Sequence, residues 1–123
     1  MDQDIHFQHQ TGFINSGETT TYFYVPYRCT LRNVIGIVQG DPGDNETVTV
    51  TCGATAAAAT TELGVLTFGD DITAGAIGTW AEAATTGGTV MEAGYWIKLV
   101  ATAGAEETSV VCDIDIELDP YAR

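Results

Sequence analysis

Basic residues are scarce in this chain. Lys and Arg number 4 among 123 residues, against 17 Asp and Glu, so the formal net charge at pH 7 is −13. A phosphate backbone is bound through clustered Lys and Arg, and an anionic bilayer attracts the same residues. We therefore expect neither nucleic acid nor a membrane among the partners of this protein.

Long apolar runs are also missing, because none approaches the ~20 residues that a membrane-spanning helix needs. The start, Met1–Asp4, lacks the basic and apolar stretches of a signal peptide. Hydrophobic residues nevertheless make up 45% of the chain, which is too many for a disordered acidic protein. We expect one folded domain with a substantial core.

Residues that usually perform catalysis are few. Neither Ser16 nor Ser109 lies in a G-x-S-x-G motif, and no phosphate-binding glycine motif is present. His6 and His9 are three residues apart, a spacing that would place them on opposite faces of a strand. We therefore predict a non-enzymatic protein with no catalytic residues, no metal site and no cofactor.

The three cysteines form no C-x-x-C pair, and an odd, sparse set is not a disulfide framework. We expect free thiols that behave as small apolar residues. If one pair were bridged, Cys52 and Cys112 would be favoured, because both fall on apolar faces of the strands described next.

Two segments alternate with the period of a β-strand. In 108–119 the apolar set ending in Leu118 alternates with Asp113, Asp115, Glu117 and Asp119, and in Glu46–Gly53 valines and Cys52 alternate with threonines. Because successive strand side chains point to opposite faces, each segment has one face for a core and one for water. Both patterns are typical of antiparallel strands.

Further strands are expected between frequent turn residues. Thr20–Tyr27 has Tyr22 and Tyr24 opposite Phe23 and Val25, and Thr30–Gln39 is a mostly buried run that includes Ile35 and Ile37. The remaining candidate strands are 64–69, 89–92 and 95–101, whereas 56–59 and 80–84 are expected to form at most one helical turn each.

This spacing predicts an all-β fold, an antiparallel β-sandwich of the jelly-roll kind. Residues 20–123 would form the sandwich, and residues 1–19 an extended N-terminal arm or an edge strand.

Acidic and aromatic clusters leave two binding functions open. The oxygen-rich segments 41–46 and 69–71 contain ligands of the kind that Ca²⁺ prefers, although neither matches an EF-hand loop. Trp80, Tyr95 and Trp96 could provide a platform for a sugar, and only one of the adjacent pair Tyr95 and Trp96 can face the core. Exposed aromatics are also typical of protein interfaces.

Several segments together resemble a known protein family. These are Y-F-Y-V-P-Y at 22–27, V-I-G-I-V-Q-G at 34–40, V-T-V at 48–50, A-G-Y-W-I-K-L-V at 93–100 and the final alternating strand. Their order is similar to that of the small β-sandwich capsid decoration (cement) proteins of tailed bacteriophages. The likeness covers about 20–118, and the first nineteen residues are not part of it.

The resemblance implies a viral structural protein that sits on the outer capsid surface of the virion. It would bind the major capsid protein, associate with itself as a dimer or trimer, and stabilise the shell. The candidate contact residues are apolar side chains of the N-terminal arm and exposed aromatics: Ile5, Phe7, Phe13, Ile14, Tyr22, Tyr24, Tyr27 and Trp96. The alternatives are a carbohydrate-binding β-sandwich module and a tail or fibre protein.

Overall fold

The computed structural model describes residues 5–10, 14–15, 20–39, 46–69, 75–83, 89–102 and 109–118. Over these ranges every regular element is a β-strand, and no helix is long and apolar enough to cross a membrane. The strands are β1 (Ile5–Gln10), β2 (Ile14–Asn15), β3 (Thr20–Tyr24), β4 (Cys29–Val38), β5 (Glu46–Gly53), β6 (Thr61–Phe68), β7 (Thr79–Glu82), β8 (Val90–Met91), β9 (Trp96–Thr102) and β10 (Ser109–Leu118).

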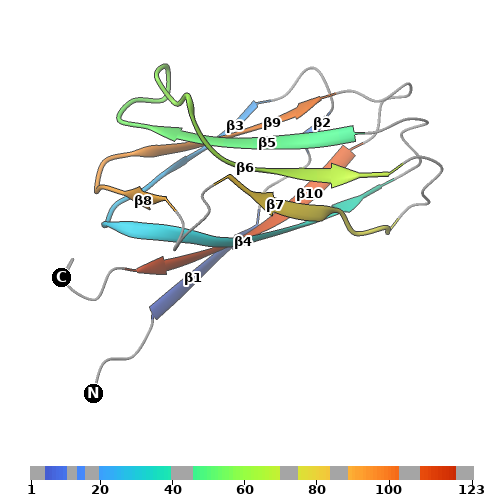
Figure 1. The fold of residues 1–123 in the computed structure, drawn as a ribbon, viewed down its shortest axis with the longest axis horizontal. Helices are drawn as coiled ribbons and strands as arrows, with labels where there is room; N and C mark the ends of the chain where they lie inside the picture. The colour runs from blue at the N-terminus through green and yellow to red at the C-terminus, as the bar shows by residue number, and fades with distance from the viewer. Residues whose placement is uncertain are drawn as a thin grey trace.

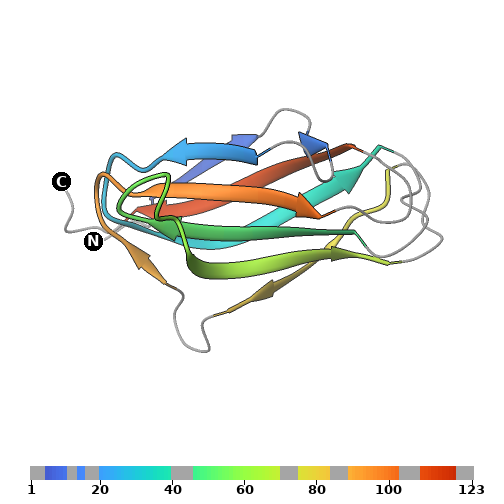
Figure 2. The same cartoon turned by 90° about the horizontal axis from the view of Figure 1, so that it is seen from above.

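These strands form two antiparallel sheets that pack against each other (Figures 1 and 2). Sheet A has the order β1-β10-β4-β8, and β2 also pairs with β10. Sheet B has the order β3-β9-β5-β6-β7. The predicted all-β sandwich is therefore confirmed.

The described part of the N-terminal segment belongs to sheet A. The backbone of β1 pairs with β10 over six residues, from Ile5 opposite Leu118 to Gln10 opposite Asp113, and Ile14 of β2 pairs with Val110. Strand β1 is the end strand of sheet A. This pairing covers one side of β10, whose other side is held by β4.

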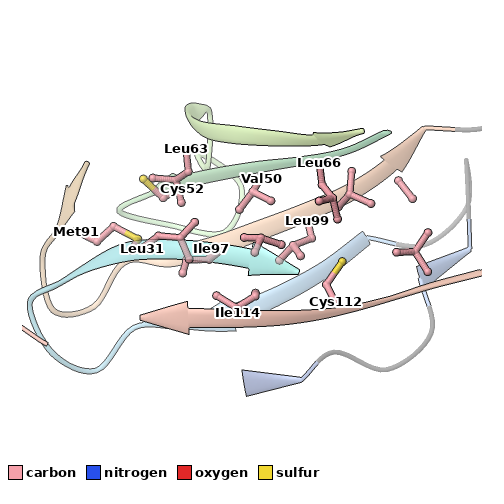
Figure 3. Close-up of a cluster of buried hydrophobic side chains, with 14 of the residues drawn as sticks. Leu31, Val50, Cys52, Leu63, Leu66, Met91, Ile97, Leu99, Cys112 and Ile114 are labelled. Atoms are coloured by element: carbon pink, nitrogen blue, oxygen red, sulfur yellow. The ribbon is translucent and has the colours of Figure 1, made fainter. Parts of the chain in front are cut away.

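Alternating apolar side chains from the two sheets build the core (Figure 3). Val48, Val50 and Cys52 of β5 point inward, as their alternation with threonines predicts, and each is at most 1% exposed. Leu66, Ile97, Leu99 and Ile114 are among the largest side chains without solvent exposure. The segment predicted at 46–53 is β5 itself, and the one predicted at 108–119 contains β10.

Two expectations about local structure are wrong. The expectation of at most one helical turn at 80–84 is wrong over residues 80–82, which belong to strand β7; this strand pairs with β6 from Gly64 opposite Glu82 to Thr67 opposite Thr79. The local sequence T-W-A-E combines Thr and Trp, which favour strands, with Ala and Glu, which do not, so the pairing partner decides its conformation. Ile35 and Ile37, assigned to a mostly buried run, are 46% and 39% exposed.

The exposure of Ile35 and Ile37 in β4 has an identifiable cause. The pairing of β4 with β10 shifts between Asp115 and Ile116, which pair with Asn33 and Leu31, so Arg32 is the extra residue of a β-bulge. Beyond the bulge, Val34, Gly36 and Val38 face the core. A Cβ at residue 36 would overlap the Cδ2 atom of Leu66, so glycine at this position leaves room for the opposite sheet.

Residues 75–82 connect the two sheets along one side of the sandwich. In residues 75–78, the N–H groups of Gly75 and Gly78 donate hydrogen bonds to the carbonyl oxygens of Val38 and Gly36, at 2.8 and 3.0 Å. Ile77 forms a β-bridge with Ile37. The next four residues are β7 in sheet B, so this crossover segment, 75–82, is hydrogen bonded to sheet A first and to sheet B afterwards.

Candidate interaction surfaces

An aromatic cluster lies on the outer face of sheet B. Alternation in β3 directs Tyr22 and Tyr24 outward, where they are 44% and 56% exposed, while Phe23 packs against the core. Tyr24 pairs with Trp96 of β9, and the ring centroids are 5.3 Å apart at an interplanar angle of 63°. Such edge-to-face pairs contribute ~0.5–1.5 kcal/mol beyond the area they bury.

The other side of Trp96 is bounded by a turn. Gly53 of β5 pairs with Trp96, and a Cβ at residue 53 would overlap the carbonyl oxygen of Ala58. The N–H of Ala58 donates to both the carbonyl and the Oγ1 of Thr55, each at 3.1 Å, which fixes the turn over β5. Position 96 therefore has an aromatic ring on one neighbouring strand and a close-packed turn on the other.

The rest of this face is rich in threonine. Thr47, Thr49 and Thr51 of β5 are half-buried, and Thr67 and Thr79 continue the row across β6 and β7. Among the described residues, the charged side chains at outward positions of β3, β9, β5 and β6 are Lys98 and Glu62, the two cross-strand partners of Thr51. The two charges cancel, so this face is close to neutral in a strongly acidic protein.

The outer face of sheet A has a different composition. Asp113, Asp115 and Glu117 follow one another at every second residue of β10, and each is half-buried. Arg32, the bulge residue of β4, donates from Nε and Nη2 to the two carboxylate oxygens of Glu117, each at 3.2 Å. Toward the other end of β4 the face becomes aliphatic, with Ile35 opposite Asp113 and Ile37 opposite Val111.

The predicted contact residues fall into two groups. Tyr22, Tyr24 and Trp96 are brought together on the face of sheet B, whereas Tyr27 is 48% exposed in the connection between β3 and β4. Ile5 and Phe7 lie in β1, whose backbone pairs with Leu118 and Ile116. Ile14 lies in β2, and Phe13 falls outside the described residues.

The two tryptophans have different surroundings. Trp80 of β7 pairs with Leu66, packs against the core and is half-buried. Tyr95 also packs against the core, so Trp96 is the member of the adjacent pair on the outer face. A sugar platform on sheet B would therefore use Trp96 with Tyr24 and not Trp80.

The cysteines are free and buried, as expected from their number and spacing. Burial raises the pKa of the Cys112 thiol to about 12 and that of Cys29 to about 11, with a smaller contribution to Cys29 from Cys52. Burial also raises the pKa of Cys52. Figure 3 shows Cys52 and Cys112 well separated along the core, so they do not form the pair that the sequence favoured.

Metal binding has little structural basis in the described part of the chain. No group of three or more His, Cys, Asp or Glu side chains converges there. Glu46, part of one candidate calcium segment, is fully buried at the start of β5. Its neighbours Asp41 and Asp44, and the acids of the second segment, Asp70 and Asp71, lie outside the described residues.

Two comparisons with known proteins give no match. No protein-family model matches this chain, and a search of curated proteins finds no match.

An exposed aliphatic group lies outside every site predicted from the sequence. Ile35, Ile37 and Ile77 are exposed to 46%, 39% and 66%, yet no candidate site included them. A signal was present in the order I-G-I at 35–37, because glycine between two isoleucines allows the glycine position to face a crowded core. The bulge at Arg32, which sets the alternation, could not be inferred from local sequence.

Proposed function

We propose that this chain is a non-enzymatic capsid decoration protein, which binds the outer surface of a bacteriophage shell and contacts its major capsid protein. The observation that carries the proposal is the aromatic cluster of Tyr22, Tyr24 and Trp96 on a nearly uncharged sheet face. Tyr and Trp are enriched where protein interfaces concentrate their binding energy, and charged residues are depleted there. The resemblance of the sequence to decoration proteins supports the choice of partner.

Binding of this kind stabilises the shell by mass action. A protein that binds the assembled lattice and not the free subunit adds its binding free energy to the assembled state. The sandwich loses little backbone conformational entropy on docking, since strand pairing already fixes the backbone that carries the contact side chains. The net charge of −13 keeps unbound copies soluble and repels them from one another.

The test uses purified protein and undecorated heads of its own phage. Wild-type protein is expected to bind the heads at low salt and to raise the temperature at which they release DNA. The variant Tyr22→Ser/Tyr24→Ser is expected to bind at least about tenfold more weakly, because it removes exposed aromatic contact area. Thr79→Ser, at an exposed position across the same sheet, is the matched control and should bind as the wild type does.

Absence of wild-type binding at low salt would overturn the proposal. Normal binding by the double tyrosine variant would place the contact elsewhere on the molecule. Circular dichroism and thermal unfolding of each variant separate loss of contact from loss of fold.

A second candidate is a carbohydrate-binding module, favoured by the position of Trp96. Its ring lies on an outer sheet face beside Tyr24 and near the hydroxyl-bearing Thr51 across β5. Aromatic faces with nearby polar groups suit sugar rings. A glycan-array signal that is lost in Trp96→Ala, together with absent head binding, would favour this function over decoration.

A further inference from the structure

The single lysine of the chain, Lys98, lies beside the aromatic cluster on sheet B. The residues on either side of it in β9 are fully buried, so Trp96 and Lys98 occupy successive outward positions of that strand. Lys98 pairs with Tyr22 of β3, and Trp96 pairs with Tyr24. These four side chains therefore form the corners of a rectangle on the outer face, three of them aromatic and one cationic.

Lys98 differs from the arginines in its surroundings. Arg28 and Arg32, the arginines of the described ranges, are each paired with a glutamate, at N–O distances of 3.5 and 3.2 Å. Within the same ranges, no carboxylate lies at ion-pair distance from Lys98, and this includes Glu62, the charged residue across β5. The half-buried ammonium group is therefore solvated by water in the free protein.

Docking through the aromatic cluster would remove that water. Opposite residues on neighbouring strands have Cβ atoms about 5 Å apart, and alternate residues of one strand are about 7 Å apart. A surface that covers Tyr22, Tyr24 and Trp96 consequently covers Lys98 at the fourth corner. Removing an ammonium group from water without a compensating anion is costly, so a partner that docks here must offset this charge.

We propose that Lys98 binds a carboxylate of the major capsid protein when the aromatic cluster docks. This inference rests on the proposed function, because it names a group that the partner must present. An Asp or Glu side chain accepts charge-assisted hydrogen bonds from the three N–H donors of the lysine. A surface that fits the three rings but lacks an acid at the fourth corner binds poorly, so Lys98 contributes specificity as well as affinity.

The first test measures binding of variants to undecorated heads. Lys98→Met keeps the aliphatic stem but removes the charge, and it is expected to bind at least about tenfold more weakly than the wild type. Lys98→Arg keeps the charge and is expected to bind within about threefold of the wild type. Glu62→Gln is the matched control on the same face, and it should bind no more weakly than the wild type does.

Thermal unfolding of the free protein tests for a merely structural role. Lys98→Met should unfold at the temperature of the wild type, because no ion pair of the described residues is lost with the ammonium group.

Zero-length cross-linking identifies the group that Lys98 meets. A water-soluble carbodiimide activates a carboxylate, the lysine amine attacks it, and an amide forms while the carbodiimide leaves as a urea that has taken up the water. Because the chain has one lysine, peptides joined through its side-chain amine are assigned directly by mass spectrometry. Decorated heads are expected to give a link from Lys98 to an Asp or Glu of the major capsid protein, and heads decorated with Lys98→Arg are expected to lack it.

The outcomes separate this inference from the proposed function. Absence of wild-type binding to heads would overturn both. Equal binding by the wild type and Lys98→Met would overturn the inference alone, while the aromatic cluster kept its role. A cross-link only to Glu62 of the same chain, or only to a second copy, would also overturn it, because the charge would then be compensated without the capsid protein.

Discussion

The two outer faces of the sandwich differ in the charge they carry. On sheet B, the described outward side chains are mainly threonine and aromatic, and Lys98 offsets Glu62. On sheet A, three carboxylates of β10 face one arginine of β4 and lie beside exposed isoleucines. In a chain with 17 acidic and 4 basic residues, a neutral face is the less expected of the two. Charge is therefore unevenly distributed between the two outer faces of the protein.

Both faces are built on the same inner pattern. Every second residue of β5 is buried, and the inward residues of β10 are buried except Ile116, which is partly buried, so the alternation that forms the core leaves the outward positions free to vary. Sheet B has mainly threonine and aromatic side chains at these positions, and sheet A has carboxylates, an arginine and isoleucines. The contrast thus arises from residues that the core does not constrain.

The largest expected effect is the opening of the whole sandwich at high pH. An unfolded thiol ionises near pH 8.5, whereas Cys29 and Cys112 have folded pKa values of about 11 and about 12. Between these values the folded state binds more protons, so stability falls as pH rises, by up to about 1.4 kcal/mol per pH unit for each thiol. Below pH 8 the thiols contribute no pH dependence.

Urea unfolding between pH 8 and 11 measures this slope. Cys112→Ala should reduce the slope even though its stability at pH 8 is lower. An unchanged slope in that variant would show that the Cys112 thiol is not protected in the folded protein.

The next largest effect sharpens the description of the sheet B face. Gly53→Ala would force the turn at Thr55–Ala58 away from β5, because its Cβ overlaps backbone atoms of Ala58 and Ala59. Overpacking of this kind costs ~1–3 kcal/mol. Gly69→Ala is the control, since a Cβ there meets nothing within 4 Å. Equal urea midpoints for the two variants would contradict the close approach of the turn beside Trp96.

The smallest effect concerns the ion pair on sheet A. Arg32 and Glu117 have side chains that are 37% and 22% exposed, so solvent screens much of their attraction. A double-mutant cycle with Arg32→Ala and Glu117→Gln should give a coupling free energy of ~0.2–1 kcal/mol that decreases with added salt. A coupling free energy well above this range would mean that the ion pair helps to determine the β-bulge in β4.

Strand positions and the core were predictable where one strand carries a clean alternation. Val48, Val50 and Cys52 identify the inward face of β5 without reference to any other strand, and Tyr22 and Tyr24 were correctly separated from Phe23. These assignments succeed because a period of two depends only on local geometry.

Features set by distant partners were not predictable in this way. β7 is a strand because β6 lies beside it, and Ile35 and Ile37 are exposed because a bulge at Arg32 resets the register with β10. The choice between Tyr95 and Trp96 likewise required the pairing of Trp96 with Tyr24. In each case the deciding interaction joins residues far apart in the sequence.

The crossover segment 75–82 adds a main-chain connection between the two sheets. Apolar contact between the sheets is close-packed but has no preferred direction. Hydrogen bonds are directional, and here the eight residues that hold Gly36 and Val38 on one side hold β6 on the other. The main chain of this segment therefore links the two sheets through backbone hydrogen bonds, in addition to the apolar contacts of the core.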